Sequence, residues 1–167
     1  MERERRFLLE SPPAPASVTA TRVITDRYLP GTRLRLRRSE RRDGGEPELK
    51  LTQKIPAARP GAVQGLITTV YLSPAEHDLF ASLPAALLTK TRLSVPPLGV
   101  DVFGGPLAGL VLAEAEFESD EAALAFVPPA WCAAEVTEDV RFTGGSLVAV
   151  SREVLAGWLG EYGIRLG

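Results

Sequence analysis

The stretch MERERRF, residues 1–7, decides how the rest of the chain is interpreted, because it is charged for almost its whole length. If it forms a β-strand, Glu2, Glu4 and Arg6 share one face, since side chains on a strand alternate with period two. Two carboxylates and a cation on one face cost repulsion and desolvation unless a partner uses them. A divalent metal ion is one such partner, because it prefers carboxylate oxygens as ligands. As a disordered, solvated tail the same stretch would need no partner.

The composition is that of an ordinary globular protein: 167 residues, of which 45% are hydrophobic and 24% charged. We therefore expect a single domain over residues 1–167. The net charge of −2 gives no basic field, so neither a nucleic acid nor a membrane is predicted as a partner. One cysteine excludes an internal disulfide. The chain shows no signal peptide and no apolar stretch of transmembrane length, which predicts a soluble, cytoplasmic protein.

The pattern along the chain predicts short strands joined by Gly/Pro turns, with three short helices. Strands are expected at residues 1–7, 21–29, 32–37, 48–54, 62–72, 89–93, 100–103, 109–118 and 136–142. A helix is expected after Ser73, where Pro74 and Glu76 complete a capping-box signature. Further helices are expected at 120–126 and 152–162. This order is typical of an α+β, β-rich domain with an antiparallel sheet and peripheral helices.

Charges of one sign collect by strand, which bears on what the sheet does. The faces at 33–37, 50–54 and 90–92 are basic, whereas those at 2–4 and 114–118 are acidic. Solvated exterior faces of a half-buried sheet are the simpler interpretation for any one strand. If the sheet instead curls into a barrel with these faces inward, the lumen has cationic and anionic walls and must hold water and a charged ligand. Basic side chains suit phosphate oxygens and carboxylates suit Mg²⁺ or Mn²⁺, which favours a metal-bound polyphosphate.

The chain also resembles the CYTH, or triphosphate tunnel metalloenzyme, superfamily. The match begins with Glu2-Arg3-Glu4-Arg5-Arg6-Phe7-Leu8, which is similar to the family's N-terminal Glu-x-Glu-x-Lys signature followed by Phe-Leu. Further similar motifs follow in family order and span nearly the whole chain: Arg33-Leu34-Arg35, Glu48-Leu49-Lys50-Leu51, Lys90-Thr91-Arg92, Val100-Asp101-Val102-Phe103, residues 109–117 and residues 135–142.

The resemblance implies a closed antiparallel tunnel of about eight strands in which a metal-dependent triphosphatase acts on inorganic tripolyphosphate or an organic triphosphate. One or two Mg²⁺ or Mn²⁺ ions would be held by Glu2, Glu4, Glu114 and Glu116. The phosphates would be bound by Arg33, Arg35, Lys50, Lys90, Arg92 and Arg141. The resemblance further implies catalytic roles for Arg6, Glu4 and Glu116, and an additional acidic site at Asp101 and Glu135. The partner would be a triphosphate-containing small molecule, and the protein a monomer or homodimer.

Three departures from the family pattern keep other functions open. Arg6 replaces the signature Lys, and a guanidinium does not readily lose a proton. Residues 62–72 carry no acid, and Gly99 stands where many relatives have Glu or Gln. A non-catalytic polyphosphate- or nucleotide-binding module is therefore the alternative to an enzyme. Adenylate cyclase chemistry is a third hypothesis, although nothing in the sequence marks an adenine pocket.

Several charged residues near these motifs are expected to be solvated. The arginines around the 43–45 turn belong to this group: Arg37, Arg38, Arg41 and Arg42. His77, early in the predicted helix, is expected at the surface.

Overall fold

The computed structural model describes residues 1–59 and 61–166, most of them in an antiparallel sheet. The strands in chain order are β1 (Glu2–Leu8), β2 (Ala20–Tyr28), β3 (Leu34–Arg41), β4 (Glu48–Pro56), β5 (Val63–Tyr71), β6 (Ala86–Val95), β7 (Leu98–Phe103), β8 (Val111–Glu116) and β9 (Ala134–Glu135).

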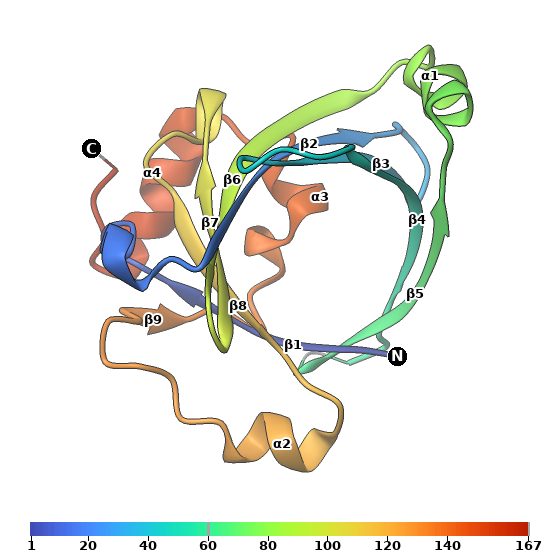
Figure 1. The fold of residues 1–167 in the computed structure, drawn as a ribbon. Coiled ribbons are helices and arrows are strands. Elements are labelled where there is room, and N and C mark those ends of the chain that lie inside the picture. Colours follow the sequence, from blue (N-terminus) through green and yellow to red (C-terminus); the bar gives the residue numbers. More distant parts are fainter. Residues whose placement is uncertain (60, 167) are drawn as a thin grey trace.

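Strands β1 to β8 close into a barrel, and β9 pairs with β1 as an extra strand. The order across the described sheet is β5-β4-β3-β2-β6-β7-β8-β1-β9, and the pairing of β5 with β1 closes the ring, as Figure 1 shows. This closing contact is short: Glu2 lies opposite Gly65 and Arg3 opposite Val63. The predicted closed antiparallel barrel of about eight strands is confirmed.

The two faces of the barrel wall differ in the way that the alternation in β1 predicts. Glu4 and Arg6 point to the interior cavity, whereas Phe7, on the opposite face, is 1% exposed in an apolar cluster with Val100 and Ala113. The ring of Phe126 covers this outer cluster, with its centroid 6.1 Å from that of Phe7. The charged face of β1 is therefore turned inward because the other face is buried on the outside.

Four helices flank the described barrel: α1 (Pro74–Ala81), α2 (Asp120–Ala125), α3 (Gly144–Leu147) and α4 (Arg152–Glu161). The predicted capping box starts α1, since Ser73 Oγ accepts from the Glu76 backbone and Glu76 Oε2 accepts from the Ser73 backbone. Contrary to the expectation, His77 in this helix is buried.

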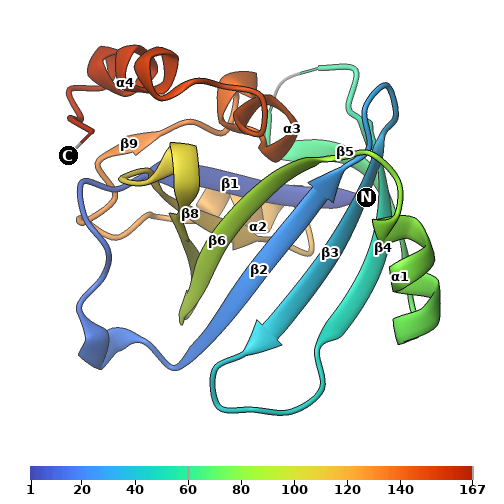
Figure 2. The same ribbon diagram turned by 90° about the horizontal axis from the view of Figure 1, so that it is seen from above.

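Helices α3 and α4 lie together at one end of the barrel (Figure 2). Their buried Leu147, Leu155 and Leu159 join an apolar cluster with Leu8 and Leu112 from the strands. The cluster plugs this end with hydrophobic side chains, which leaves the remaining interior to charged residues. None of the helices described is long and apolar enough to cross a bilayer.

The prediction of a strand at residues 136–142 is wrong. Pairing with β1 ends at Glu135, which lies opposite Phe7, and a 3₁₀ turn follows at Val140–Phe142. Asp139 caps that turn, because its Oδ1 accepts from the Arg141 backbone at 3.1 Å. Local hydrogen bonds of this kind compete with strand pairing, and here they redirect the chain towards the barrel end.

Candidate functional site

The barrel encloses a cavity of about 560 Å³ whose lining is strongly charged. Strand register places the cation Arg37 opposite the cation Lys50. Arg35, two residues earlier on the same face of β3, lies opposite Thr52. Among the residues predicted to bind phosphate, those that line the cavity are Arg33, Arg35, Lys50, Lys90 and Arg92. The placement of these five side chains is what phosphate binding requires, and the role itself stays a prediction.

Two buried aspartates lie beside these cations on the inward faces of neighbouring strands, since Asp26 is opposite Arg37 and Asp101 is opposite Arg92. Asp101 is 0% exposed and accepts from Lys90 Nζ at 2.5 Å and from Arg92 Nε at 2.7 Å. Asp26 is 1% exposed and accepts two hydrogen bonds from Arg37, each 2.7 Å long. Asp101 is therefore paired with two of the predicted phosphate-binding cations and is not among the residues that line the cavity, and the additional acidic site stays a prediction.

The four glutamates predicted to bind metal line one side of the same cavity. Register places Glu4 opposite Glu116, and Glu114 opposite Arg6 on the same pair of strands. Three of the four have a cation as neighbour. Glu2 Oε2 is 2.5 Å from Lys54 Nζ, Glu114 pairs with Arg92, and Glu4 Oε1 is 3.8 Å from Arg6 Nε. Glu116, at the end of β8, is exposed.

The pKa values of two of these glutamates shift in opposite directions. Burial raises the pKa of Glu4 to about 7, and the negative charges of Glu114 and Glu2 add to this increase. Burial also acts to raise the pKa of Glu114, but the charges of Arg92 and Lys90 outweigh it and hold that pKa below its ordinary value. A further positive charge near Glu4 would favour its ionised form.

The donor set fits a hard divalent cation in its chemistry, because carboxylate oxygens are the ligands of Mg²⁺ and Mn²⁺. Glu2 already pairs with Lys54, whereas Glu4 is crowded by the negative charges of Glu114 and Glu2, so Glu4 would gain most from a cation. Within residues 1–59 and 61–166, however, no three acidic, His or Cys side chains already converge as metal ligands. Metal binding would therefore require Glu2 and Glu114 to turn away from their present cationic partners.

Arg6, the residue in place of the signature Lys, lines the cavity but is only 3% exposed. Its Nη1 donates to Phe142 O at 3.2 Å, and its Nη2 donates to Thr137 O at 2.9 Å and to Gln64 Oε1 at 3.0 Å. Its Nε is buried without a hydrogen bond. Arg6 thus joins β1 to the segment before α3, while one donor next to Glu4 is left unused.

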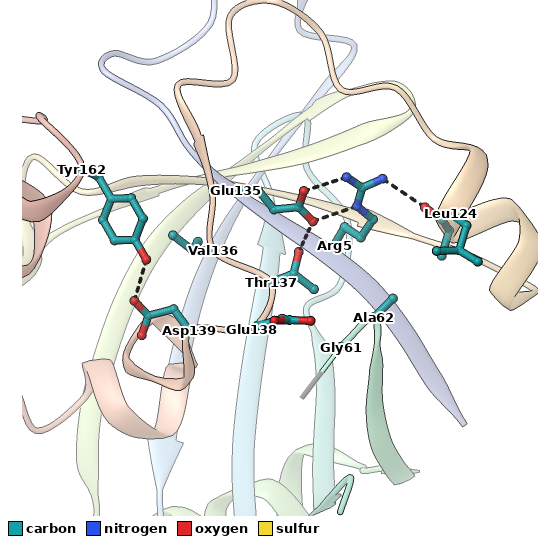
Figure 3. Close-up of a pocket in the computed structure, with 11 residues that line it drawn as sticks. Arg5, Gly61, Ala62, Leu124, Glu135, Val136, Thr137, Glu138, Asp139 and Tyr162 are labelled. Atoms are coloured by element: carbon teal, nitrogen blue, oxygen red, sulfur yellow. Dashed lines mark hydrogen bonds and ion pairs between the residues drawn. The ribbon is translucent and has the colours of Figure 1, made fainter. Parts of the chain in front are cut away.

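Glu135 does not lie in the cavity. It faces a groove of about 700 Å³ on the outside of the barrel, shown in Figure 3. Its carboxylate accepts from Arg5 Nε at 2.8 Å and Nη2 at 2.7 Å, and from Thr137 Oγ1 at 2.6 Å. The hydrogen bond from Arg5 lowers the pKa of Glu135. The groove and the cavity share lining residues such as Gly61 and Glu138. The partner of Glu135 is Arg5, which lies in the groove and not in the cavity.

Arg141 also lies outside the cavity lining. Its guanidinium forms ion pairs with Asp139 at 2.7 Å and Glu161 at 2.8 Å, and it stacks over the Trp158 ring at 5.6 Å. These contacts tie the 3₁₀ turn to α4. The expectation that Arg141 binds phosphate has no support from its position, because its fork of donors is already used by two carboxylates.

Sequence reasoning missed several cavity residues. Arg37, expected to be solvated, lines the cavity with a side chain that is 13% exposed and paired with Asp26. The signal was present, because Arg37 continues the alternation of Arg33 and Arg35. Gln64 in the lining, and Asp26 beside it, gave no such signal, since the importance of each comes from a partner on another strand.

Comparisons with known proteins agree with this architecture. No family model matches the chain. Over 48 residues, the chain is 52% identical to an inorganic triphosphatase of Nitrosomonas europaea. That alignment covers 29% of this chain and 32% of the relative, so it spans about a third of the curated protein.

Likeness to solved structures extends over most of the chain. The crystal structure of the inorganic triphosphatase NE1496 matches with a TM-score of 0.57 and 28% identity, over 90% of this chain and 95% of the other. The protein PH1819 of Pyrococcus horikoshii OT3 matches with a TM-score of 0.51 and 17% identity, over 99% of this chain and 92% of the other. The second likeness is one of fold alone.

A closed antiparallel barrel with both cations and carboxylates in its lumen defines a class of tunnel proteins built to hold a charged ligand. Within this class the chain is similar to the inorganic triphosphatase NE1496, in line with the motifs that resemble the CYTH, or triphosphate tunnel metalloenzyme, superfamily.

Proposed function

We propose that the chain is a divalent-metal-dependent triphosphatase that hydrolyses the terminal phosphoryl group of inorganic tripolyphosphate or an organic triphosphate. The charge of the cavity carries this proposal. The described lining has nine Lys or Arg residues and five Glu residues, an excess of four positive charges when all are ionised. Asp26 and Asp101, buried beside these cations, reduce the excess to two. A site of this kind favours a polyanion that brings one divalent cation with it.

The carboxylates Glu2, Glu4, Glu114 and Glu116 would hold the ion. Mg²⁺ or Mn²⁺ supplies neutralisation of phosphate charge and a more acidic bound water. In the described structure Lys54 engages Glu2, and Arg92 engages Glu114. If these glutamates held a cation, Lys54 and Arg92 would lose these partners and their donors could serve phosphate oxygens. The ion pairs Lys54–Glu2 and Arg92–Glu114 therefore hold these charged side chains in place within the cavity.

The basic side chains on the opposite side of the cavity would position the phosphates and stabilise their charge, which are the dominant contributions in phosphoryl transfer. Lys90 and Arg92 are oriented by Asp101, and Arg37 is oriented by Asp26, so their donors are fixed before a phosphate arrives. The Arg6 guanidinium is anchored by the carbonyl oxygens of Thr137 and Phe142, so its role in the proposal is to orient neighbouring groups.

The test is phosphate release from tripolyphosphate by Glu4→Gln and Glu116→Gln, each of which removes one negative charge without a change in size. We expect each variant to lose more than about tenfold in rate, the scale of losses at metal sites. Glu118→Gln is the matched control, because Glu118 lies beyond the end of β8 and outside the cavity lining. Parental rates in both Glu4→Gln and Glu116→Gln would refute the assignment.

A non-catalytic polyphosphate-binding module is the second candidate, and the state of Arg6 favours it. The Arg6 guanidinium is occupied by protein oxygens, whereas an ammonium at this place would be free to approach the cavity. Calorimetry that detects tight tripolyphosphate binding, together with no turnover over hours, would support the module. A gain of turnover in Arg6→Lys would then identify Arg6 as the cause.

A further inference from the structure

Asp26 is a buried acid that touches no part of the cavity directly but contacts two cations of its wall. It lies on β2 opposite Arg37 of β3. Its Oδ1 and Oδ2 accept from Nε and Nη2 of Arg37, both at 2.7 Å, in the bidentate geometry of an arginine–carboxylate pair. Arg35 Nε is 3.9 Å from Oδ1. Asp26 therefore fixes one guanidinium and attracts the next.

The contacts leave donors available on the cavity side. Arg37 uses Nε and Nη2 on Asp26, and its Nη1 makes no hydrogen bond with any described residue. Arg35 Nε is buried beside Asp26 Oδ1 without a hydrogen bond, so the donors that Arg35 can offer to the cavity are those of its Nη groups. Both arginines line the cavity. A guanidinium held on one edge by a buried carboxylate presents its remaining donors in a fixed direction, which is what recognition of a phosphate requires.

The same arrangement recurs on the neighbouring strands, which argues that it is not accidental. Strand β6 pairs with β2 on one side and with β7 on the other. On β7, Asp101 is 0% exposed and holds Lys90 and Arg92, as Asp26 holds Arg37. Two buried aspartates thus contact four cations of the cavity lining: Arg35, Arg37, Lys90 and Arg92.

We infer that Asp26 is a positioning residue for phosphoryl transfer, acting through Arg37 and Arg35. The inference rests on the proposed triphosphatase function, because it assigns Asp26 to the same cavity. Asp26 makes no contact with substrate. It holds the guanidinium of Arg37 in the orientation that stabilises charge on the transferred phosphoryl group.

Removal of this carboxylate has two opposite electrostatic consequences, and these distinguish positioning from general support of the fold. One negative charge fewer beside these arginines makes the cavity more positive, so binding of a polyanion does not weaken. Loss of the bidentate pair lets Arg37 rotate, so stabilisation of the transition state is lost. A positioning role therefore lowers kcat without a rise in KM.

The experiment compares Asp26→Asn with the parent in steady-state hydrolysis of tripolyphosphate, with thermal unfolding of each protein as a check on folding. Asp43→Asn is the matched control, because Asp43 forms an ion pair with Arg41 on the exposed hairpin, away from the cavity. We expect Asp26→Asn to lower kcat at least tenfold with a KM equal to or below that of the parent. Asp43→Asn should keep both parameters within twofold.

A kcat within twofold of the parent in folded Asp26→Asn, or a rise in KM alone, would overturn the inference. If Asp26→Asn does not fold, Arg37→Lys applies the same test, since it keeps the positive charge but loses the fork held by Asp26. An unchanged kcat in Arg37→Lys would also overturn the inference that Asp26 acts through Arg37. Failure of the parent itself to release phosphate would instead refute the proposed triphosphatase, so the two failures are distinguishable.

Discussion

At the scale of single residues, the cavity is built from charges that are already paired before any ligand arrives. Asp26 is 1% exposed, a position where an isolated carboxylate would be costly. Burial acts to raise its pKa, but the hydrogen bonds and charge of Arg37, with Arg35 and Lys90, hold that pKa below the ordinary value of 3.8. The pairing therefore stabilises the folded protein as well as orienting the arginine.

This pairing predicts a pH dependence with a definite sign. A carboxylate whose pKa is lowered on folding stabilises the native state above its unfolded pKa, and that contribution is lost as the pH falls through the folded pKa. We expect the difference in free energy of unfolding between the parent and Asp26→Asn to be largest at pH 6–7 and to shrink below about pH 4. Urea unfolding of both proteins from pH 7 to pH 3 measures it. A difference that does not vary with pH would show that the charge of Asp26 is not responsible.

At the scale of elements, patterns within a short stretch of sequence correctly predicted the face of a strand and the start of a helix. The alternation of Arg33 and Arg35 with Leu34 and Leu36 placed the basic face of β3 correctly, and the capping box at Ser73 marked the start of α1. The segment 136–142 was mispredicted because its apolar and polar residues alternate like a strand, whereas the Asp139 cap turns it towards α3. Its role is to bring Thr137 and Phe142 to the Arg6 guanidinium.

The plug formed by α4 gives a prediction at this scale. Leu155 is 0% exposed in the cluster that closes one end of the barrel, whereas the neighbouring Val154 is 46% exposed. Leu155→Ala should lower the free energy of unfolding by about 2–5 kcal/mol, because it leaves a cavity in a packed core. Val154→Ala, the matched control, should change it by less than about 0.5 kcal/mol. Urea unfolding measures both, and equal effects would mean that α4 does not anchor the barrel end.

At the scale of the whole molecule, closure of the barrel creates the site. Arg6 and Thr137 are separated by 131 positions in the sequence, and Arg6 and Gln64 by 58, yet they meet at the seam where β1 leaves β5. Patterns within one strand predict which face is charged but not which strands become neighbours. For this reason Asp26, Gln64 and the outward placement of Glu135 were beyond prediction from the residues alone.

Closure also explains why the motifs identified most of the cavity. Nearly all predicted metal- and phosphate-binding residues lie on inward faces of β1, β3, β4, β6 and β8, where strict alternation fixes their direction. Arg141 and Glu135 are both outside the cavity: Arg141 lies in a 3₁₀ turn, and Glu135 lies in β9 opposite the outward-facing Phe7.

The central claim is that the charged cavity hydrolyses a triphosphate with the help of a divalent cation. Steady-state release of phosphate from tripolyphosphate, measured with Mg²⁺, with Mn²⁺ and with excess chelator, tests it most directly. We predict release with at least one of the two metals and none with chelator, because the carboxylates on β1 and β8 otherwise have no cation to share with the phosphate chain. Release that is undiminished by chelator, or no release with either metal, would contradict the claim.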